Sequence, residues 1–204
     1  IGARGTYYAS MGLMGTIAPT SEIFVPEDLP ALLNGGHELA CHTFDHFDSW
    51  DTAPSEFDAS ILRNRDALAE LAPSVRFESF SFPITQPRPA TKRLAARHFE
   101  SCRGGGQTPN IDEADLALLN SYFLEKCGGR LDPVRQVIEE NRSRNGWLIF
   151  STHDVSPSPT PYGCTPSHFR DVICAAVDSG ASILPVKDAL RVARGDARGS
   201  SSRA

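Results

Sequence analysis

The chain contains no apolar run near the ~20 residues that a membrane-spanning helix needs. Its first residues lack the basic segment and apolar segment of a signal peptide, and they lack an initiator methionine. We therefore expect the natural N-terminus to be missing. A formal net charge of −5 excludes an electrostatic case for binding nucleic acid or an anionic membrane. Nothing in the composition indicates an oligomeric state.

Cysteine is scarce and unpaired in pattern, with five residues and no Cys-x-x-Cys. An odd number without that spacing argues against a disulfide framework and against a cysteine-rich zinc site. We expect buried free thiols in a reducing compartment, which favours a cytoplasmic location. The residues concerned are Cys41, Cys102, Cys127, Cys164 and Cys174.

Nucleotide-binding motifs are also absent, since no Gly-x-Gly-x-x-Gly opens a helix and no phosphate-loop motif occurs. The run Gly104–Gly106 is expected to be a loop. With 204 residues, 40% hydrophobic and 22% charged, the composition is that of one soluble globular domain. We assign residues 1–194 to that domain and residues 195–204, rich in Gly, Ser and Arg, to a disordered tail.

Apolar periodicity predicts alternating strands and helices along the whole domain. We expect strands over 6–9, 37–42, 75–82, 99–102, 147–152 and 182–185. We expect helices over 26–33, 54–71, 89–98, 115–126, 133–144, 166–179 and 187–193. Such alternation implies an α/β fold with a parallel sheet, as a barrel or a doubly wound layer.

The most informative feature is the pair His42 and His46, which follows the expected strand 37–42. Histidines four residues apart, on a helical turn or a tight loop, direct both imidazoles the same way. Two neutral imidazole nitrogens held like this are most of a zinc-type site. The alternative is a pair of hydrogen-bonded surface histidines. Thr43 is expected to brace the loop by bonding its backbone.

A second candidate, His153-Asp154, follows the apolar strand 147–152. Polar groups at the carboxyl end of a buried parallel strand stand where α/β folds present catalytic groups. His153 can act as a general acid or base near neutral pH, with a carboxylate to orient it. The alternative is a solvated histidine in a strand-end turn.

Four short stretches follow one another along the chain in the order in which one known superfamily has its motifs. They are Gly5–Tyr8, Gly36–His46, Phe80–Pro83 and Leu148–Asp154. Together they resemble the Ala-Thr-Phe-Phe, Gly-His-Glu…His-(Ser/Thr)-x-x-His, aromatic-Pro and late-His motifs of the polysaccharide deacetylase superfamily. This NodB-homology superfamily is also called carbohydrate esterase family four. The resemblance implies a distorted (β/α)7-type parallel barrel. It also implies a metal-dependent hydrolase that removes N-acetyl groups from a poly- or oligosaccharide.

The resemblance implies that His42 and His46 bind a divalent metal, with Zn²⁺ preferred among ions that accept His and carboxylate. It also implies that His153 is the general acid and that Asp154 or another carboxylate holds its imidazole. An N-acetylated carbohydrate is the expected partner. Candidate substrate-binding residues are Thr43, Pro83, Arg103 and Trp50.

The chain departs from the family in two places. The Thr-Phe-Asp-Asp-Gly motif, which supplies a general base and third metal ligand, is absent, because only five residues precede Thr6. We therefore expect a domain that lacks its first strand and has impaired activity. The family Arg before Pro83 is also absent, and Arg103 is a possible substitute. The alternatives are an inactive carbohydrate-binding relative and an amidohydrolase acting on a formamide or cyclic imide.

Overall fold

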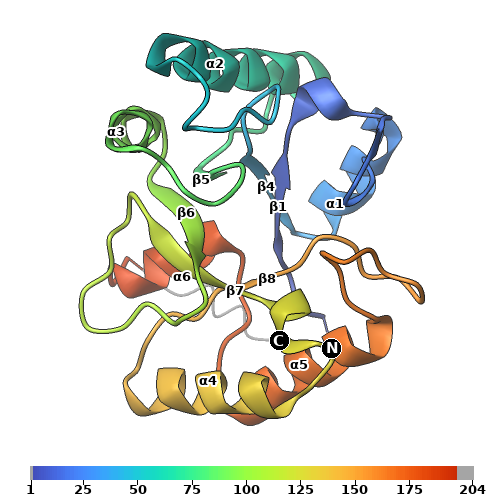
Figure 1. Cartoon of the computed structure of the whole chain (residues 1–204), viewed down its shortest axis with the longest axis vertical. Helices are drawn as coiled ribbons and strands as arrows, with labels where there is room; N and C mark the ends of the chain where they lie inside the picture. Colours follow the sequence, from blue (N-terminus) through green and yellow to red (C-terminus); the bar gives the residue numbers. More distant parts are fainter. Residues whose placement is uncertain (1, 197–204) are drawn as a thin grey trace, which may run out of the picture.

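Six parallel strands form one curved sheet at the centre of the computed structural model, which describes residues 2–196 (Figure 1). Along the sheet the strands follow chain order, so each crossover leads to the neighbouring strand. The result is a half-barrel of the expected distorted NodB type. The strands are β1 (Thr6–Ala9), β4 (Glu38–Cys41), β5 (Ser79–Ser81), β6 (Ser101–Gly106), β7 (Leu119–Phe123) and β8 (Phe150–Ser151).

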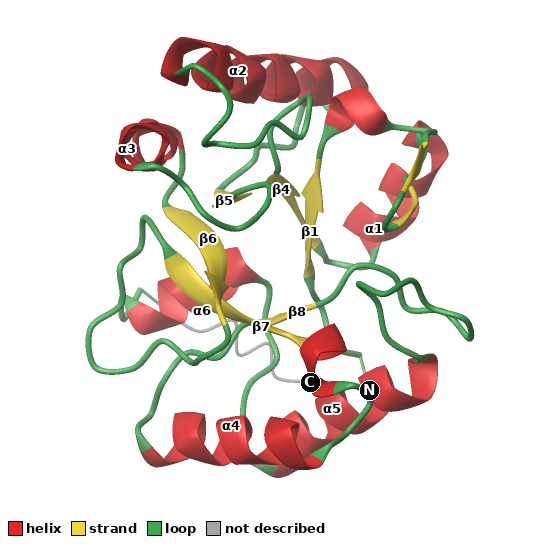
Figure 2. Ribbon diagram, in the orientation of Figure 1, coloured by secondary structure: helices red, strands yellow, loops and turns green. Residues whose placement is uncertain are grey.

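Helices surround the sheet on the outside of its curve (Figure 2). They are α1 (Leu29–Asn34), α2 (Pro54–Leu71), α3 (Pro89–His98), α4 (Asp132–Ser143), α5 (Pro166–Asp178) and α6 (Val186–Ala193). Short 3-10 turns lie at Met11–Leu13, Pro26–Asp28 and Leu124–Cys127, and an antiparallel pair joins β2 (Ile17–Ala18) to β3 (Ser21–Glu22). No helix of residues 2–196 is long and apolar enough to cross a bilayer.

The two faces of the sheet differ in chemistry, as the strand register shows. Phe80 pairs with Cys41 on one side and Cys102 on the other, and all three side chains belong to the outer hydrophobic core. The buried aromatic rings of Phe57 and Phe82 pack with Phe80 there. The alternate positions therefore face the inside of the half-barrel, because successive side chains of a strand point to opposite faces.

A second hydrophobic cluster covers the other end of the sheet. It joins α4 and α5 to β7 and the turn after it, through side chains that include Val134, Val172 and Leu124, each 0% exposed. The five cysteines are free thiols, as expected, and four of them are buried in these cores.

Glu38 ties three elements together at the amino ends of the strands. Its carboxylate, on a residue only 1% exposed, accepts hydrogen bonds from the hydroxyls of Thr6 and Ser79. It also accepts one from the backbone N–H of Lys187, at 3.0 Å, in the first turn of α6. An anion at a helix N-terminus satisfies a free donor and interacts favourably with the helix dipole.

Several expected elements are confirmed with their bounds, including β1, α2 and α3. The expected helix over 115–126 is wrong, because residues 119–123 form β7 in the middle of the sheet. The β7 sequence Leu-Asn-Ser-Tyr-Phe is largely buried but does not alternate between apolar and polar residues, so periodicity does not mark it as a strand. The expected strand over 182–185 is also absent from the described chain, where this segment has no regular structure.

The glycine run at 104–106 is not a loop, because it forms the second half of β6. A Cβ atom added to Gly104 would lie 2.5 Å from the Thr85 carbonyl oxygen, and one on Gly106 would lie 2.3 Å from Asn120 Oδ1. Glycine here permits close packing of neighbouring backbone. Most of the predicted tail, residues 197–204, lies outside the described residues.

Candidate functional site

The two histidines come together because the chain reverses sharply after β4. Thr43 and His46 both adopt left-handed backbone conformations, with φ of 60° and 57°. The Asp45 carboxylate fixes the loop to α2 by accepting from the Ser60 hydroxyl at 2.7 Å and by pairing with Arg63. The His42 and His46 rings then lie 4.8 Å apart, centre to centre.

The orientation of His42 is set by the neighbouring strand β5. Its Nδ1 lies 2.7 Å from the Ser81 carbonyl oxygen, so Nδ1 carries the hydrogen and Nε2 keeps its lone pair. Burial lowers the pKa of His42 well below its usual value, and the charges of His46 and Arg103 lower it further. Burial also lowers the pKa of His46. Both imidazoles are therefore neutral at pH 7 and able to bind a cation.

His153 stands at the same edge of the sheet, two residues after β8. Its Nδ1 donates to the Tyr162 carbonyl oxygen at 3.2 Å, and the Tyr162 ring meets the imidazole edge-on. The charge of His153 contributes to lowering the pKa of both His42 and His46, so the three predicted histidines share one site. His153 itself is exposed to solvent.

Asp154 does not hold the His153 imidazole, and that expectation is corrected. Its carboxylate instead accepts from the Thr160 N–H and hydroxyl, at 2.8 and 2.6 Å, closing the loop 154–164. Burial opposes ionisation of Asp154, but the two Thr160 hydrogen bonds outweigh this and lower its pKa. The Tyr162 carbonyl takes the orienting position near His153 because the loop folds back over the strand end.

Two predicted substrate-binding residues turn out to be buried. Thr43 is 0% exposed and accepts from the Phe47 N–H at 3.3 Å, which confirms the bracing role and removes the side chain from contact with a substrate. Pro83 is also buried, while its neighbour Ile84 is 61% exposed. Ile84 and Thr85 have positive φ values, 59° and 70°, at the carboxyl end of β5.

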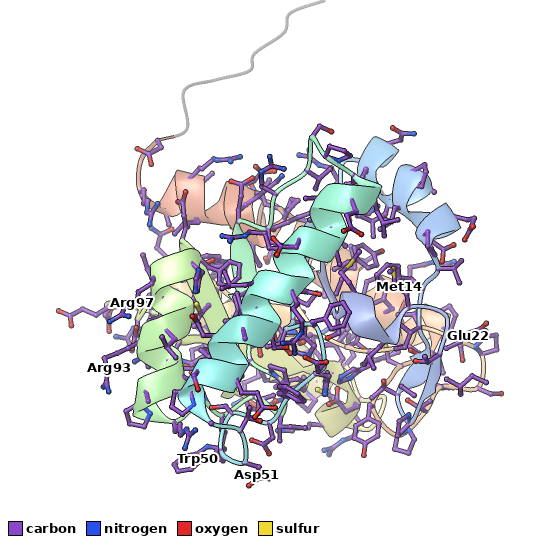
Figure 3. All side chains as sticks on the ribbon, turned by 90° about the horizontal axis from the view of Figure 1, so that it is seen from above. Met14, Glu22, Trp50, Asp51, Arg93 and Arg97 are labelled. Atoms are coloured by element: carbon purple, nitrogen blue, oxygen red, sulfur yellow. The ribbon has the colours of Figure 1, made fainter. Side chains whose placement is uncertain are left out.

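Arg103 does not lie beyond a strand, as expected, but within β6 on the inner face of the sheet. Its guanidinium stacks on the Tyr8 ring, 4.4 Å from the ring centre. Burial lowers the pKa of Arg103 and raises that of Tyr8. Trp50 is 58% exposed in the loop before α2, at the outer edge of the molecule beside Asp51 (Figure 3).

Among residues 2–196 no group of three or more His, Cys, Asp and Glu side chains is placed to hold a metal ion. The donor set nevertheless fits two of the three protein ligands that a catalytic zinc site uses. Both imidazoles are neutral, and the Nε2 of His42 is free because Nδ1 is engaged. A ligating histidine commonly donates its other nitrogen to a carbonyl in this manner.

Sequence reasoning missed three groups at this site. The carbonyl groups of Ser81 and Tyr162, which orient His42 and His153, leave no mark in a sequence because every residue has a carbonyl. The third is Glu125, directly after β7, whose Oε2 is buried without a hydrogen-bond partner. Burial raises the pKa of Glu125, and the charge of His153 partly offsets this. Because residues 115–126 were expected to form a helix, the position of Glu125 near the end of a strand was not recognised.

A comparison with protein families matches the amino-terminal part of the chain. Residues 3–99 match the family model described as polysaccharide deacetylase. No curated protein matches the chain significantly. The residues matched by the family model, 3–99, include the expected strand motif at Gly5–Tyr8 and the histidine motif at Gly36–His46.

Solved structures share the fold at low sequence identity. A putative polysaccharide deacetylase from Mycobacterium smegmatis is 17% identical, with a TM-score of 0.69 over 99% of this chain and 76% of that one. A family 4 acetyl xylan esterase from Clostridium thermocellum, with a cobalt ion, is 18% identical, with a TM-score of 0.62 over 95% and 80%. A family 4 carbohydrate esterase from Streptomyces lividans, with acetate, is 17% identical, with a TM-score of 0.55 over 88% and 77%.

Against some solved structures the matched region is shorter. It spans about half the length of the deacetylase PplD from Streptococcus pyogenes (52%) and of IcaB from Ammonifex degensii (47%). The matched family model, the half-barrel and the histidine motifs at the strand ends agree with one another. Residues 3–99 therefore match the polysaccharide deacetylase family model, and the described residues share the fold of the solved deacetylases and family 4 esterases.

Proposed function

We propose that this chain is the deacetylase domain of a metal-dependent enzyme that hydrolyses the N-acetyl amide of a sugar in a poly- or oligosaccharide. The observation that carries the proposal is the His42–Ser81 hydrogen bond. It fixes Nε2 of one imidazole beside a second imidazole, at the sheet edge that also holds His153. The proposal includes impaired activity of the chain as given, since the described residues supply only two metal-binding side chains.

His42 and His46 would hold the metal, for which Zn²⁺ is the first candidate and Co²⁺, present in the related esterase structure, is the second. When bound, such an ion polarises the acetyl carbonyl and lowers the pKa of a coordinated water toward ~7. The protein's own contribution is to keep the two imidazoles neutral and oriented. Burial and the Ser81 carbonyl do this together.

His153 would donate a proton to the departing sugar nitrogen. Its Nδ1–H is engaged by the Tyr162 carbonyl, so a proton on Nε2 is the one directed away from the loop. Its exposure to solvent allows it to be reprotonated after each cycle. General acid catalysis of this kind typically contributes 10²–10⁴ in rate.

The test measures acetate release from N-acetylglucosamine oligomers with added Zn²⁺ or Co²⁺. We expect weak but metal-dependent release by the parent chain. His153→Ala should lower kcat by about 10²–10⁴ at unchanged metal content. His42→Ala and His46→Ala should lower the metal content itself. His98→Ala is the matched control, because His98 lies on α3 bonded to Asp58 and belongs to no part of the site.

A parent chain that releases no acetate, and whose metal content is unaffected by His42→Ala, would contradict the proposal. Sugar binding by such a chain would support the alternative of an inactive carbohydrate-binding relative. Release of formate and an amine or ammonia from a formamide, or opening of a cyclic imide to its amide-acid, without deacetylation, would instead support the amidohydrolase alternative. A predominantly cytoplasmic location stays a prediction.

A further inference from the structure

Tyr162 is an exposed aromatic side chain beside His153. It lies in the loop 154–164 after β8 and is 46% exposed. Its ring centre is 5.8 Å from that of the His153 imidazole, with 69° between the two planes. In such a T-shaped pair the imidazole covers at most one face of the tyrosine ring. The ring therefore presents apolar surface to solvent directly next to this histidine.

The backbone of Tyr162 is tied to His153 as well. The Tyr162 carbonyl oxygen accepts two hydrogen bonds from His153, one from the backbone N–H at 3.3 Å and one from Nδ1 of the imidazole at 3.2 Å. A displacement of the loop would therefore move the tyrosine ring and disturb the imidazole together. The position of the aromatic ring relative to the imidazole is set by the fold of the loop.

Contacts within the loop fix its shape. The Asp154 carboxylate accepts from the Thr160 N–H and hydroxyl, and the Asp154 carbonyl accepts from the Cys164 N–H at 2.9 Å. Gly163 permits this close approach, since a Cβ there would lie 2.1 Å from Asp154 Oδ1. The segment before Tyr162 reads Ser-Pro-Ser-Pro-Thr-Pro, and each proline fixes one φ angle. The tyrosine is thus carried on a preformed loop.

Position, rather than exposure, distinguishes Tyr162 from other exposed aromatic residues, since single exposed apolar side chains are common on protein surfaces. Trp50 is 58% exposed but lies at the outer edge of the molecule beside Asp51 (Figure 3). Tyr7 is 51% exposed and also makes a T-shaped contact with a histidine, at 5.3 Å. That histidine, His37, precedes β4 and so lies at the amino ends of the strands, away from the site.

We propose that the Tyr162 ring is the stacking platform for a sugar ring of the substrate. The inference deepens the proposed function and rests on it for the choice of a sugar as ligand. The C–H groups on one face of a pyranose carry partial positive charge, which favours contact with the negative face of an aromatic ring. A ring on a preformed loop loses little conformational freedom on binding, so more of the contact energy appears as affinity.

The test is a titration of the metal-free full chain, in EDTA, with N-acetylglucosamine oligomers, followed by calorimetry and by proton NMR of the sugar. We expect Tyr162→Ala to weaken binding about tenfold and Tyr162→Phe to stay within about twofold of wild type. Upfield ring-current shifts of sugar C–H protons should occur with wild type and Tyr162→Phe and disappear with Tyr162→Ala. Because Tyr162→Ala keeps the backbone carbonyl, the contact with His153 should persist.

Two further variants separate the platform from other effects. Tyr7→Ala is the matched control, because it removes a tyrosine of similar exposure and similar histidine contact at the other end of the strands. It should leave the affinity and the sugar shifts unchanged. Trp50→Ala tests the rival aromatic ring and should weaken binding less than Tyr162→Ala does. Circular dichroism establishes that each variant is folded.

The proposal is overturned if the wild-type chain binds no oligomer, or if folded Tyr162→Ala binds as tightly as wild type. It is also overturned if the sugar shifts disappear in Trp50→Ala and persist in Tyr162→Ala. Binding is measured without metal and without turnover, so the two proposals can fail separately. A chain that binds through Tyr162 but releases no acetate contradicts the deacetylase proposal alone, and acetate release with unchanged binding by Tyr162→Ala contradicts the platform alone.

Discussion

Ser81 links the two chemistries of the half-barrel at the level of a single residue. Its carbonyl oxygen, at the end of β5, accepts from His42 Nδ1 and so fixes the direction of Nε2. Its hydroxyl, on the inner face, is buried without a hydrogen-bond partner among the described residues, and Arg103 is its register neighbour on β6. A change of backbone position at Ser81 therefore affects His42 and the inner face together, whereas a change of side chain affects the inner face alone.

Acid should destabilise the metal-free chain through His42. Burial lowers the folded-state pKa of His42 below its unfolded value near 6.5, so the unfolded state binds more protons in the window below that value. Stability is fully present above pH ~6.5 and is lost as the pH falls. The loss approaches at most about 1.4 kcal/mol per pH unit for one proton.

Urea unfolding between pH 5 and 7, with EDTA, measures this slope. His42→Asn removes the titrating group and keeps a donor that can reach the Ser81 carbonyl. We expect a clearly shallower dependence of the unfolding free energy on pH in the variant. Equal slopes in variant and wild type would show that His42 is not held neutral by its surroundings.

For single residues, the sequence predicts which side chains belong to the site better than it predicts the groups that hydrogen-bond to them. His42, His46 and His153 were identified by spacing and by their places after predicted strands, and the structure brings them together. The groups that orient them are backbone carbonyls, which carry no sequence signature. Asp154 was misassigned because adjacency in sequence suggested a contact that the turn at Thr160 redirects.

Elements are joined through a few buried polar contacts, and Glu38 is the clearest of these. It connects β4 to β1, β5 and α6 through three donors. Glu38→Gln replaces one acceptor oxygen by a donor that faces other donors, so we expect a loss of about 2–4 kcal/mol in unfolding free energy. Denaturant unfolding at pH 7 measures it.

Glu22→Gln is the matched control, because Glu22 is exposed on β3 and labelled at the periphery in Figure 3. The control should change stability by no more than about 0.5 kcal/mol. Similar effects of the two substitutions would show that the three contacts of Glu38 do not hold α6 to the sheet.

The packing of β6 against the loop after β5 gives a second test between elements. Gly104→Ala places a Cβ 2.5 Å from the Thr85 carbonyl oxygen and 2.8 Å from Leu118 Cδ1. Relief of this overlap requires backbone movement, and we expect a destabilisation of about 1–3 kcal/mol. The midpoint of thermal unfolding measures the change.

Gly5→Ala provides the comparison, since nothing lies within 4 Å of a Cβ at Gly5 and its φ is not positive. That substitution should be close to neutral. If both alanine variants unfold at the same midpoint as wild type, the contact between Gly104 and Thr85 is looser than the structure shows.

Most elements of the fold follow from local patterns. The stripe of Phe57, Ile61 and Leu68 marks α2, and all three side chains are buried. Sequence patterns fail to predict secondary structure where contacts with the rest of the fold determine it. The β7 segment is buried on both faces and so lacks alternation, and the glycines of β6 form a strand only because close neighbours on both sides exclude side chains.

For the whole molecule, stability rests on two hydrophobic clusters that share one sheet. Phe57→Ala in the first cluster should cost about 3–5 kcal/mol. Because β5, β6 and β7 are hydrogen-bonded in sequence, we expect this loss to shift a single transition of the entire chain. Far-ultraviolet circular dichroism and tryptophan fluorescence should report the same midpoint.

Val134→Ala, in the second cluster, is the companion variant. It should lower the same single midpoint by a smaller amount, because fewer buried atoms are removed. Two separated transitions, each sensitive to one substitution only, would show that the halves of the domain unfold independently.

The alternation of hydroxyls inside and aromatic rings outside along β5 has a consequence for variation. Substitutions at outward-facing positions, such as Phe80, affect folding, because the new side chain must match the volume available in the packed core. Substitutions at the inward position Ser81 change the polar lining of the half-barrel, whereas Ser79 is constrained by its hydrogen bond to Glu38. A library that diversifies inward positions outside the Glu38 contacts would therefore vary this lining on an unchanged scaffold.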